Sequence, residues 1–275
     1  MKAACYIMTR NVYKDIVPSL KSLLINSDVD KVYILAEDDD IGMKLPDKVE
    51  IINISDQPYF TKDSPNWENW WAWIILIRAA FCKIFPDLDR ILSLDLDTLV
   101  VEDISKLWDI PMGNNYAAGA LDLPLMTGDR KYINGGVVLW NLKQLRDGTA
   151  DEMIKLLNTR KFTYPEQDCL NLVCEGKIYL LNGIYNYGTF SRANGSPKIL
   201  HFAGQGLKRY YEDERVQEYL NLPWEECVYG KRSTKAASGI PVKKSKGFNM
   251  CGACGSIMLI NEQKYCHECG KPVKW

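Results

Sequence analysis

The chain has 275 residues, of which 47% are hydrophobic and 25% charged, and this composition excludes a disordered, collagen-like or coiled-coil protein. The net charge of −1 hides an asymmetry: residues 227–275 carry nine lysines and arginines against two acidic residues, whereas residues 1–226 carry 25 basic and 33 acidic residues. An acidic body joined to a basic tail predicts more than one domain.

The secondary structure expected in chain order alternates apolar strands with helices. Helices are expected at 11–25, 67–85, 149–159 and 166–175. Strands are expected at 3–9, 32–36, 49–54, 90–94, 116–121, 136–140, 178–181 and 199–202. This alternation predicts an α/β fold with a largely parallel sheet covered on both faces. Its ligand site is expected at the carboxyl ends of the strands.

Five of the nine cysteines are scattered through the body, in mostly apolar surroundings: Cys5, Cys82, Cys169, Cys174 and Cys227. Thiols of this kind suit small core residues in a reducing compartment. The N-terminus has no long apolar core, and the most apolar run, 70–85, is too short to span a bilayer. We therefore expect a cytoplasmic protein, with a position peripheral to the inner face of the membrane left open.

Two aspartates close the strand expected at 90–94. Asp95 and Asp97 lie two positions apart where the strand becomes a turn, so both carboxylates can reach one hard divalent cation. Magnesium or manganese suits such carboxylates and shares its other positions with phosphate oxygens. Turn-forming or helix-capping aspartates are the alternative for an isolated pair.

Four ordered segments resemble the signature of family-eight glycosyltransferases, which include glycogenin, lipopolysaccharide galactosyltransferases and galactinol synthases. The first segment is Asp89-Arg-Ile-Leu-Ser-Leu-Asp-Leu-Asp97, which looks like the family's metal site. The others are Tyr132-Ile-Asn-Gly-Gly136, Pro165-Glu-Gln-Asp-Cys-Leu-Asn171 and Leu200-His-Phe-Ala-Gly204. The resemblance covers residues 1 to about 215.

The resemblance implies a GT-A fold, which is a Rossmann-like α/β sheet, and transfer of a hexose from UDP-glucose or UDP-galactose. Asp95, Asp97 and His201 would hold manganese or magnesium, which binds the donor diphosphate. An imidazole with two carboxylates is a mixed site that tolerates manganese. A lone histidine at the end of an apolar strand is otherwise more often structural.

The resemblance also implies a nucleotide site that contains Thr9, Asn11, Tyr13 and Arg78. The Tyr13 ring would stack on uracil, since an aromatic face binds a planar base at low entropy cost. Arg78 would place a cation near the donor phosphate or sugar. A helix-packing tyrosine and an exposed helix arginine are the alternatives.

A sugar pocket follows from the same resemblance, with Asp122 near the donor sugar. Amides and carboxylates suit it, because sugar hydroxyls both donate and accept hydrogen bonds. Turns and helix caps are the alternative roles for these residues. The family retains anomeric configuration, so Gln167 and Asp122 are the expected catalytic residues, with Gln167 stabilising the lower sugar face. The sugar-binding set is Asn134, Gly135, Glu166, Gln167, Asp168 and Gly204.

The closing motif departs from the family pattern His-x-x-Gly-x-x-Lys-Pro-Trp. After Gly204 the lysine is displaced by one residue, to Lys208, and Pro-Trp is absent. Lys208, or Arg209 beside it, would replace the family lysine at the diphosphate. No counterpart of the glycogenin acceptor tyrosine is visible, so self-glycosylation is not indicated.

The tail carries two C-x2-C pairs separated by eleven residues: Cys251, Cys254, Cys266 and Cys269. This spacing predicts a structural zinc ribbon with four thiolate ligands, which leave no open position for catalysis. The segment is too short for its own core, so the metal would drive its folding. A rubredoxin-like iron site and a disulfide pair are the lower-ranked alternatives.

The predicted domains are a GT-A domain at 1–225, a basic flexible linker at 226–248 and the zinc ribbon at 249–275. The expected partners are a UDP-sugar donor and a saccharide, lipid-linked or protein acceptor. For the ribbon we rank contact with protein or a second subunit above nucleic acid. The rival functions are a nucleotidyltransferase-like enzyme, which lacks the support of a phosphate loop, and a sugar-nucleotide-binding protein whose ribbon is an interaction module.

Overall fold

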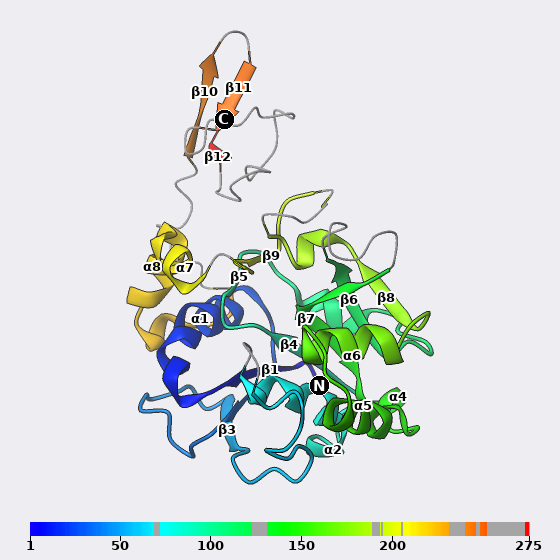
Figure 1. Cartoon of the computed structure of the whole chain (residues 1–275). Coiled ribbons are helices and arrows are strands. Elements are labelled where there is room, and N and C mark those ends of the chain that lie inside the picture. The colour runs from blue at the N-terminus through cyan, green and yellow to red at the C-terminus, as the bar shows by residue number, and fades with distance from the viewer. Residues whose placement is uncertain are drawn as a thin grey trace. The chain divides into compact units, whose positions relative to one another are not determined.

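Figure 1 shows the helices and strands of the computed structural model. The chain divides into two compact units. Unit 1 comprises residues 1–16, 29–96 and 105–181, and unit 2 comprises residues 17–28, 97–104 and 182–275. The structure describes residues 1–68, 72–122, 131–188, 193, 195–204, 206–230, 240–245, 248–251 and 273–274.

Unit 1 is built on a seven-stranded sheet with the strand order β3-β2-β1-β4-β7-β6-β8. Its strands are β1 (Ala3–Met8), β2 (Lys31–Ala36), β3 (Val49–Asn53), β4 (Arg90–Leu94), β6 (Ala117–Leu121), β7 (Ile133–Asn141) and β8 (Ile178–Leu181). Strands β1 to β4 run parallel to one another, β6 is parallel to β8, and β7 is antiparallel to both β4 and β6. The predicted α/β class with a parallel-dominated sheet is confirmed.

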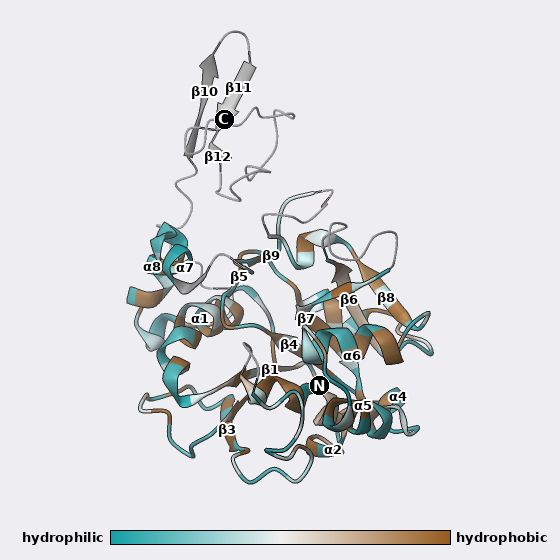
Figure 2. Ribbon diagram, viewed as in Figure 1, coloured by the Kyte–Doolittle hydropathy of each residue, from teal (hydrophilic) through white to brown (hydrophobic). Residues whose placement is uncertain are grey.

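The central strands are apolar because both faces of the sheet are covered. Every residue of β1 is buried, and so are four of the five residues of β4. Such strands read as continuous hydrophobic runs rather than as alternating patterns. Figure 2 shows this as brown ribbon along the central strands.

Short helices pack against the sheet of unit 1 and share one apolar core with it. That core joins sheet side chains such as Ile91 and Trp140 to helix side chains such as Phe81 and Met153. The helices among the described residues of this unit are η1 (Arg10–Asp15), η2 (Trp73–Ala80), α2 (Phe81–Ile84), η3 (Ser105–Asp109), α4 (Leu142–Leu145), α5 (Thr149–Thr159) and α6 (Pro165–Val173).

The long helix expected at 67–85 is wrong in type and extent. Trp67 and Glu68 lie in a turn, and the chain then forms the 3₁₀ helix η2 and the one-turn α-helix α2. Six of the eight η2 residues are buried, so no polar face marks an α-helical period. Branched and aromatic side chains also lose rotamer freedom in an α-helix, which weakens the α-helical preference of this run.

The sheet topology of unit 1 gathers polar residues at one edge. Glu37 follows β2, Asp95 follows β4 and Asp122 follows β6, each at a carboxyl end. Because β7 is antiparallel, its first residues reach the same edge, where the Asp95 N–H donates to the Gly136 carbonyl (2.8 Å). This edge is where α/β sheets bind ligands.

Unit 2 contains most of helix α1 (Ile16–Asn26) and a two-stranded antiparallel sheet of β5 (Thr98–Val100) and β9 (Ile199–His201). The helices α7 (Gly206–Glu212) and α8 (Glu214–Asn221) follow β9, with short turns η4 (Gly183–Tyr185) and η5 (Trp224–Glu226). Leu99, Leu200 and Tyr210 form part of its small apolar core. The pairing Thr98↔His201 places the residues just before β5 beside the end of β9.

The C-terminal strands are β10 (Ile240–Ser245), β11 (Phe248–Cys251) and β12 (Val273–Lys274), in the order β11-β10-β12. Strand β10 lies within the range predicted as a flexible linker, where it pairs antiparallel with β11. Cys251 ends β11, but the other predicted zinc ligands, Cys254, Cys266 and Cys269, lie outside the described residues.

The five body cysteines are buried thiols, as expected for core residues. Among the described helices, none is at once long enough and apolar enough to cross a bilayer.

Candidate active site

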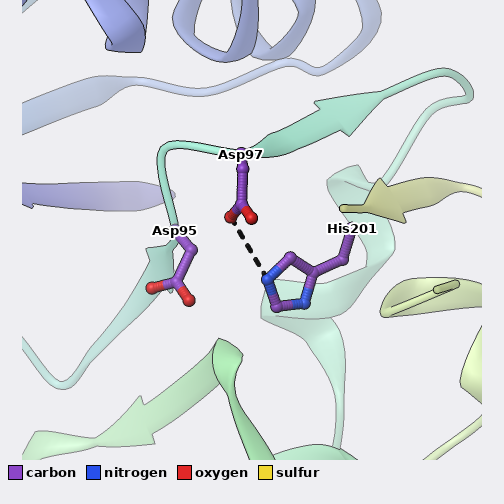
Figure 3. Close-up of side chains that lie close together, drawn as sticks. All are labelled: Asp95, Asp97 and His201. Carbon is purple, nitrogen blue, oxygen red and sulfur yellow. Dashed lines mark ion pairs between the residues drawn. The ribbon is translucent and has the colours of Figure 1, made fainter. Parts of the chain in front are cut away.

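Asp95, Asp97 and His201 each offer one ligand atom, and these atoms lie within 4.8 Å of one another (Figure 3). The backbone explains the grouping. Asp95 follows β4 directly, Leu96 intervenes, and Asp97 precedes β5, whose partner strand β9 ends in His201. The Phe202 N–H donates to the Asp97 carbonyl (3.0 Å), which fixes the two strand ends.

The hydrogen bonds of His201 determine which ring nitrogen faces the carboxylates. Its Nδ1 lies 2.7 Å from Asn186 Oδ1, and a carbonyl oxygen can only accept. Nδ1 therefore carries the proton, and in the neutral ring Nε2 presents its lone pair, 3.3 Å from Asp97 Oδ1. His201 is only 5% exposed, so this orientation is held by the protein. A divalent cation fits this donor set, because metal-bound histidines are oriented by such a second hydrogen bond.

Arg78 is a buried cation in unit 1, rather than an exposed helix arginine. Its guanidinium donates to Asp95 Oδ1, to Glu166 Oε2 (3.3 Å) and to the Gly135 carbonyl (3.0 Å). These two acidic neighbours raise the pKa of Arg78 against the opposing effect of burial. Arg78 thus ties the end of β4 to the start of β7 and to helix α6.

Glu166 is almost fully buried, with an exposed fraction of 2%. Burial raises the pKa of its carboxyl to about 7, with Arg78 opposing the shift and Asp95 adding to it. Among the residues that the structure describes, Glu166 Oε1 has no hydrogen-bond partner. A buried acceptor of this kind is an unusual feature, and it suits a ligand hydroxyl.

Gln167 lies on the first turn of α6, and both ends of its amide are engaged. Its Oε1 accepts from the Gly135 N–H (2.6 Å), and its Nε2 donates to Asp122 Oδ2 (2.9 Å) and to the Tyr132 hydroxyl (3.2 Å). A Cβ on Gly135 would lie 3.1 Å from Glu166 Oε2 and 3.3 Å from Gln167 Oε1. Glycine is therefore what lets the start of β7 approach α6 so closely.

Two further residues of the predicted sugar set have defined contacts. Asn134 donates to Asp122 Oδ2 (3.3 Å) and accepts from the Gly136 N–H (2.9 Å). The Asp168 carboxylate accepts from the N–H groups of Thr163 and Tyr164 and from the Tyr132 hydroxyl. Asp168 thus links Tyr132 to the backbone of the residues that precede α6.

Tyr13, whose ring is expected to stack on uracil, is held through its hydroxyl group by two residues that follow β2. The hydroxyl donates to Asp38 Oδ2 (2.9 Å) and accepts from the Glu37 N–H (3.1 Å). The Glu37 carboxylate in turn accepts from Trp73 Nε1 (3.2 Å). Burial and the Asp38 carboxylate raise the pKa of Tyr13 to about 12, so the hydroxyl stays protonated.

The remaining predicted residues lie on turns and surfaces. Thr9 precedes η1, and Asn11 is exposed within it. Gly204 follows β9 with φ of +69°, a conformation that favours glycine. Lys208 is exposed on α7, where its amine lies 4.0 Å from Glu212. These positions are open to a ligand but have few fixed contacts.

Sequence reasoning missed four residues that position this site: Glu37 and Asp38 at Tyr13, Tyr132 at Gln167, and Asn186 at His201. Tyr132 is the first residue of the segment Tyr-Ile-Asn-Gly-Gly136, so its position in the sequence could have indicated that it belongs to the site. Asn186 lies 15 residues before His201 with no local pattern to join them.

Residues 9–208, more than half of the chain, match Glycosyl transferase family 8. A putative glycosyltransferase of Haemophilus influenzae is 26% identical over 126 residues (40% of this chain, 38% of that protein). General stress protein A of Bacillus subtilis is 25% identical over 192 residues (54% and 67%). The lipopolysaccharide 1,2-glucosyltransferase of Escherichia coli is 30% identical over 131 residues (40% and 38%). The match thus spans well under half the length of the first and third relatives.

Solved structures share the fold at low sequence identity. The galactosyltransferase LgtC, in complex with donor and acceptor sugar analogs, has a TM-score of 0.60 at 17% identity, covering 81% of this chain and 98% of that one. The glycosyltransferase GlyE of Streptococcus pneumoniae has a TM-score of 0.61 at 20% identity, covering 82% and 62%. The sheet is therefore GT-A-like, and the match over residues 9–208 shows that the chain belongs to glycosyl transferase family 8.

Proposed function

We propose that this chain is a retaining hexosyltransferase that uses UDP-glucose or UDP-galactose with manganese, or magnesium in its place. The observation that supports this most is the donor set of Asp95, Asp97 and His201, in which Asn186 directs the His201 lone pair toward Asp97. Bound there, the cation would offset the charge that develops on the departing diphosphate. Arg78 holds Asp95 in place for this set.

The sugar pocket is proposed at the start of β7 and α6. Glu166 Oε1, which is buried and without a partner among the described residues, is suited to accept from a sugar hydroxyl. Asp122 and Asn134 supply a carboxylate and an amide at the same edge of the sheet. Gly204 and Asp168 complete the proposed set, with Asp168 acting through the start of α6.

Retention follows if the acceptor attacks on the face from which the diphosphate leaves. The bond between the anomeric carbon and the phosphate oxygen breaks, the acceptor oxygen bonds to that carbon, and its proton passes to the departing phosphate. Gln167 stabilises the opposite face as a dipole, since an amide is a poor nucleophile. The tight packing of Gly135 against Gln167 keeps this amide in place.

The nucleotide is proposed to bind at η1, with the Tyr13 ring on uracil and Thr9 and Asn11 beside it. The hydroxyl contacts of Tyr13 to Asp38 and Glu37 support this, because they fix the position of the hydroxyl end of the ring before uracil binds. Lys208 is proposed to reach the diphosphate, for which its exposure on α7 leaves it available.

The test is release of UDP from UDP-glucose and UDP-galactose, measured with manganese, with magnesium and with a chelator. We expect manganese-dependent release, and an α-linked product by NMR when an acceptor is found. Gln167→Ala should lower turnover by about a hundredfold or more while UDP affinity changes little. Nucleotide binding without sugar cleavage would instead favour a sugar-nucleotide-binding protein.

We also propose that residues 249–275 form a structural zinc ribbon in a cytoplasmic protein. The support is the C-x2-C spacing of the four tail cysteines and the buried thiols of the body, which suit a reducing compartment. Its proposed partner is protein, including a second copy of this chain, because the ribbon has few basic or aromatic residues for nucleic acid.

The ribbon is tested by metal analysis of the full chain purified under reducing conditions. We expect about one zinc per chain, lost in Cys254→Ser and Cys269→Ser, with UDP release by the body retained. The buried Cys82→Ser variant is the matched control and should keep its zinc. Iron in place of zinc, or no metal, would contradict the proposal.

A further inference from the structure

The Tyr132 hydroxyl lies between two residues of helix α6. It is 2.5 Å from Asp168 Oδ1 and 3.2 Å from Gln167 Nε2. Tyr132 itself directly precedes β7, and its carbonyl accepts from the Asp122 N–H (2.9 Å). The residue therefore connects the end of β6, the start of β7 and the first turns of α6 within unit 1.

The contacts of Asp168 determine the direction of the Tyr132 hydroxyl proton. Asp168 Oδ2 already accepts from the N–H groups of Thr163 (3.1 Å) and Tyr164 (2.8 Å), which fixes the carboxylate with Oδ1 toward Tyr132. A carboxylate only accepts, so Tyr132 donates to it. Burial and this hydrogen bond to Asp168 raise the pKa of Tyr132, which keeps the hydroxyl protonated.

Once its proton points at Asp168, the Tyr132 oxygen can only accept. The end of the Gln167 amide that faces it must then be the NH₂ group, whose other hydrogen reaches Asp122 Oδ2 (2.9 Å). The carbonyl end is left for the Gly135 N–H (2.6 Å). A flipped amide would set an oxygen against the Asp122 carboxylate and an NH₂ group against an N–H donor.

Tyr132 provides the third point of attachment for the amide. With only Asp122 and Gly135 as partners, the amide would be held by one hydrogen bond at each end. The third contact, from the amide to Tyr132, links the amide to Asp168, which is anchored to backbone groups at the start of α6. Small errors in such placement are costly to turnover, because the reacting groups must be held in a narrow range of positions.

We propose that Tyr132 is a positioning residue for glycosyl transfer, which fixes the orientation of the Gln167 amide through the hydrogen-bond chain Asp168–Tyr132–Gln167–Asp122. This inference rests on the proposed role of Gln167 at the donor sugar. It assigns Tyr132 no contact with the substrate, so its loss affects the chemical step and leaves donor binding intact.

The variant Tyr132→Phe keeps the ring and removes the hydroxyl. We expect kcat for UDP release to fall about tenfold while the KM for the donor stays within about twofold, since a lost transition-state interaction lowers kcat without raising KM. A wild-type kcat in the folded variant would overturn the proposal. So would a raised KM with unchanged kcat, which would mean that Tyr132 acts in donor binding.

A matched control lies at the start of β6. The Tyr116 hydroxyl donates to Asp147 Oδ2 (2.8 Å) and accepts from Lys177 Nζ (3.3 Å), so Tyr116→Phe loses the same two kinds of contact. We expect Tyr116→Phe to lose thermal stability and keep the wild-type kcat. An equal fall of kcat in both variants would show a general effect of stability and would overturn the assignment to Tyr132.

The coupling to Gln167 is tested with Tyr132→Phe, Gln167→Ala and the double variant. If Tyr132 acts through Gln167, adding Tyr132→Phe to Gln167→Ala lowers kcat no further. Independent multiplication of the two losses would contradict the chain. The thermal unfolding of the same four proteins gives a second cycle, in which non-additive Tm changes are expected and additive ones would contradict the contact itself.

These outcomes separate the inference from the function on which it rests. A wild-type protein that cleaves no UDP-hexose contradicts the proposed function, and the Tm cycle then still tests the hydrogen-bond chain. A wild type that turns over, with a Tyr132→Phe variant of equal kcat, contradicts the inference alone.

Discussion

The proposed cation site (Asp95, Asp97 and His201) and the hydrogen-bond network around Gln167 both consist of polar side chains. They differ in how hydrogen-bond donors and acceptors are paired. In the first, His201 Nε2 and a carboxylate oxygen of Asp97 lie 3.3 Å apart, an arrangement that a cation bound between them would stabilise. In the second, the amide of Gln167 and the hydroxyl of Tyr132 match each acceptor to a donor within the protein. We therefore propose that the first region binds a cation, and that the second holds its side chains in place.

The largest effect is expected at the proposed cation site. Asp97→Asn removes a carboxylate ligand, so manganese-dependent UDP release should fall about a thousandfold, since the charge on the leaving group is no longer offset. Manganese affinity, measured by calorimetry on the same protein, should fall with it. The exposed Asp63→Asn variant is the control, and equal activity in Asp97→Asn would remove Asp97 from the ligand set.

The next largest effect is expected in the network around Gln167 when a methyl group is added at Gly135. Gly135→Ala places a Cβ about 3.1 Å from Glu166 Oε2 and 3.3 Å from Gln167 Oε1, so one of these side chains must move. We expect kcat to fall by about tenfold to a hundredfold, measured as UDP release, with a smaller change in UDP affinity. An unchanged kcat would show that the site tolerates this displacement.

The buried carboxyl group of Glu166 gives a pH-dependent effect on stability. The folded state raises the pKa of Glu166 to about 7 from 4.5, so the folded protein binds its proton more tightly than the unfolded chain. This contribution to the free energy of unfolding is lost as the pH rises from about 4.5 to 7 and is constant above that. Glu166→Gln should flatten the profile of Tm against pH in that range, whereas Glu175→Gln, at an exposed site, should leave it unchanged. A Glu166→Gln profile parallel to wild type would contradict the shift.

The smallest effect is expected at Tyr13, on which the uracil base is proposed to stack. Tyr13→Phe removes the hydroxyl contacts to Asp38 and Glu37 but keeps the ring, so the donor KM should rise about threefold with little change in kcat. Steady-state kinetics with the preferred UDP-hexose measures this. A fall in kcat at unchanged KM would place Tyr13 in the chemical step instead.

The sequence predicted the parts of the fold that depend on local pattern. Strands such as Arg90–Leu94 follow from apolar runs bounded by polar residues, and α5 and α6 follow from helical spacing and from Pro165 at a helix start. The helix expected at 67–85 failed because nearly all of η2 is buried, which removes the amphipathic period on which such a prediction depends.

The site was predictable in its residue types but not in its pairings. Asp95, Asp97 and His201 stand in recognisable segments, and the structure groups them. The partners that orient them are set by the tertiary fold. Asn186 faces His201 because residues 186–188 lie beside β9, and Arg78 is buried because its helix η2 packs against α5, α6 and β1. Neither relation has a signature in local spacing.

The proposed cation site is tested most directly by calorimetry of UDP binding, with manganese and with a chelator, in wild type and in Asp97→Asn. If Asp95, Asp97 and His201 hold the cation that binds the donor diphosphate, manganese should tighten UDP binding of the wild type at least about tenfold and leave Asp97→Asn unaffected. UDP affinity that is equal with manganese and with chelator, or equal enhancement in Asp97→Asn, would contradict the account.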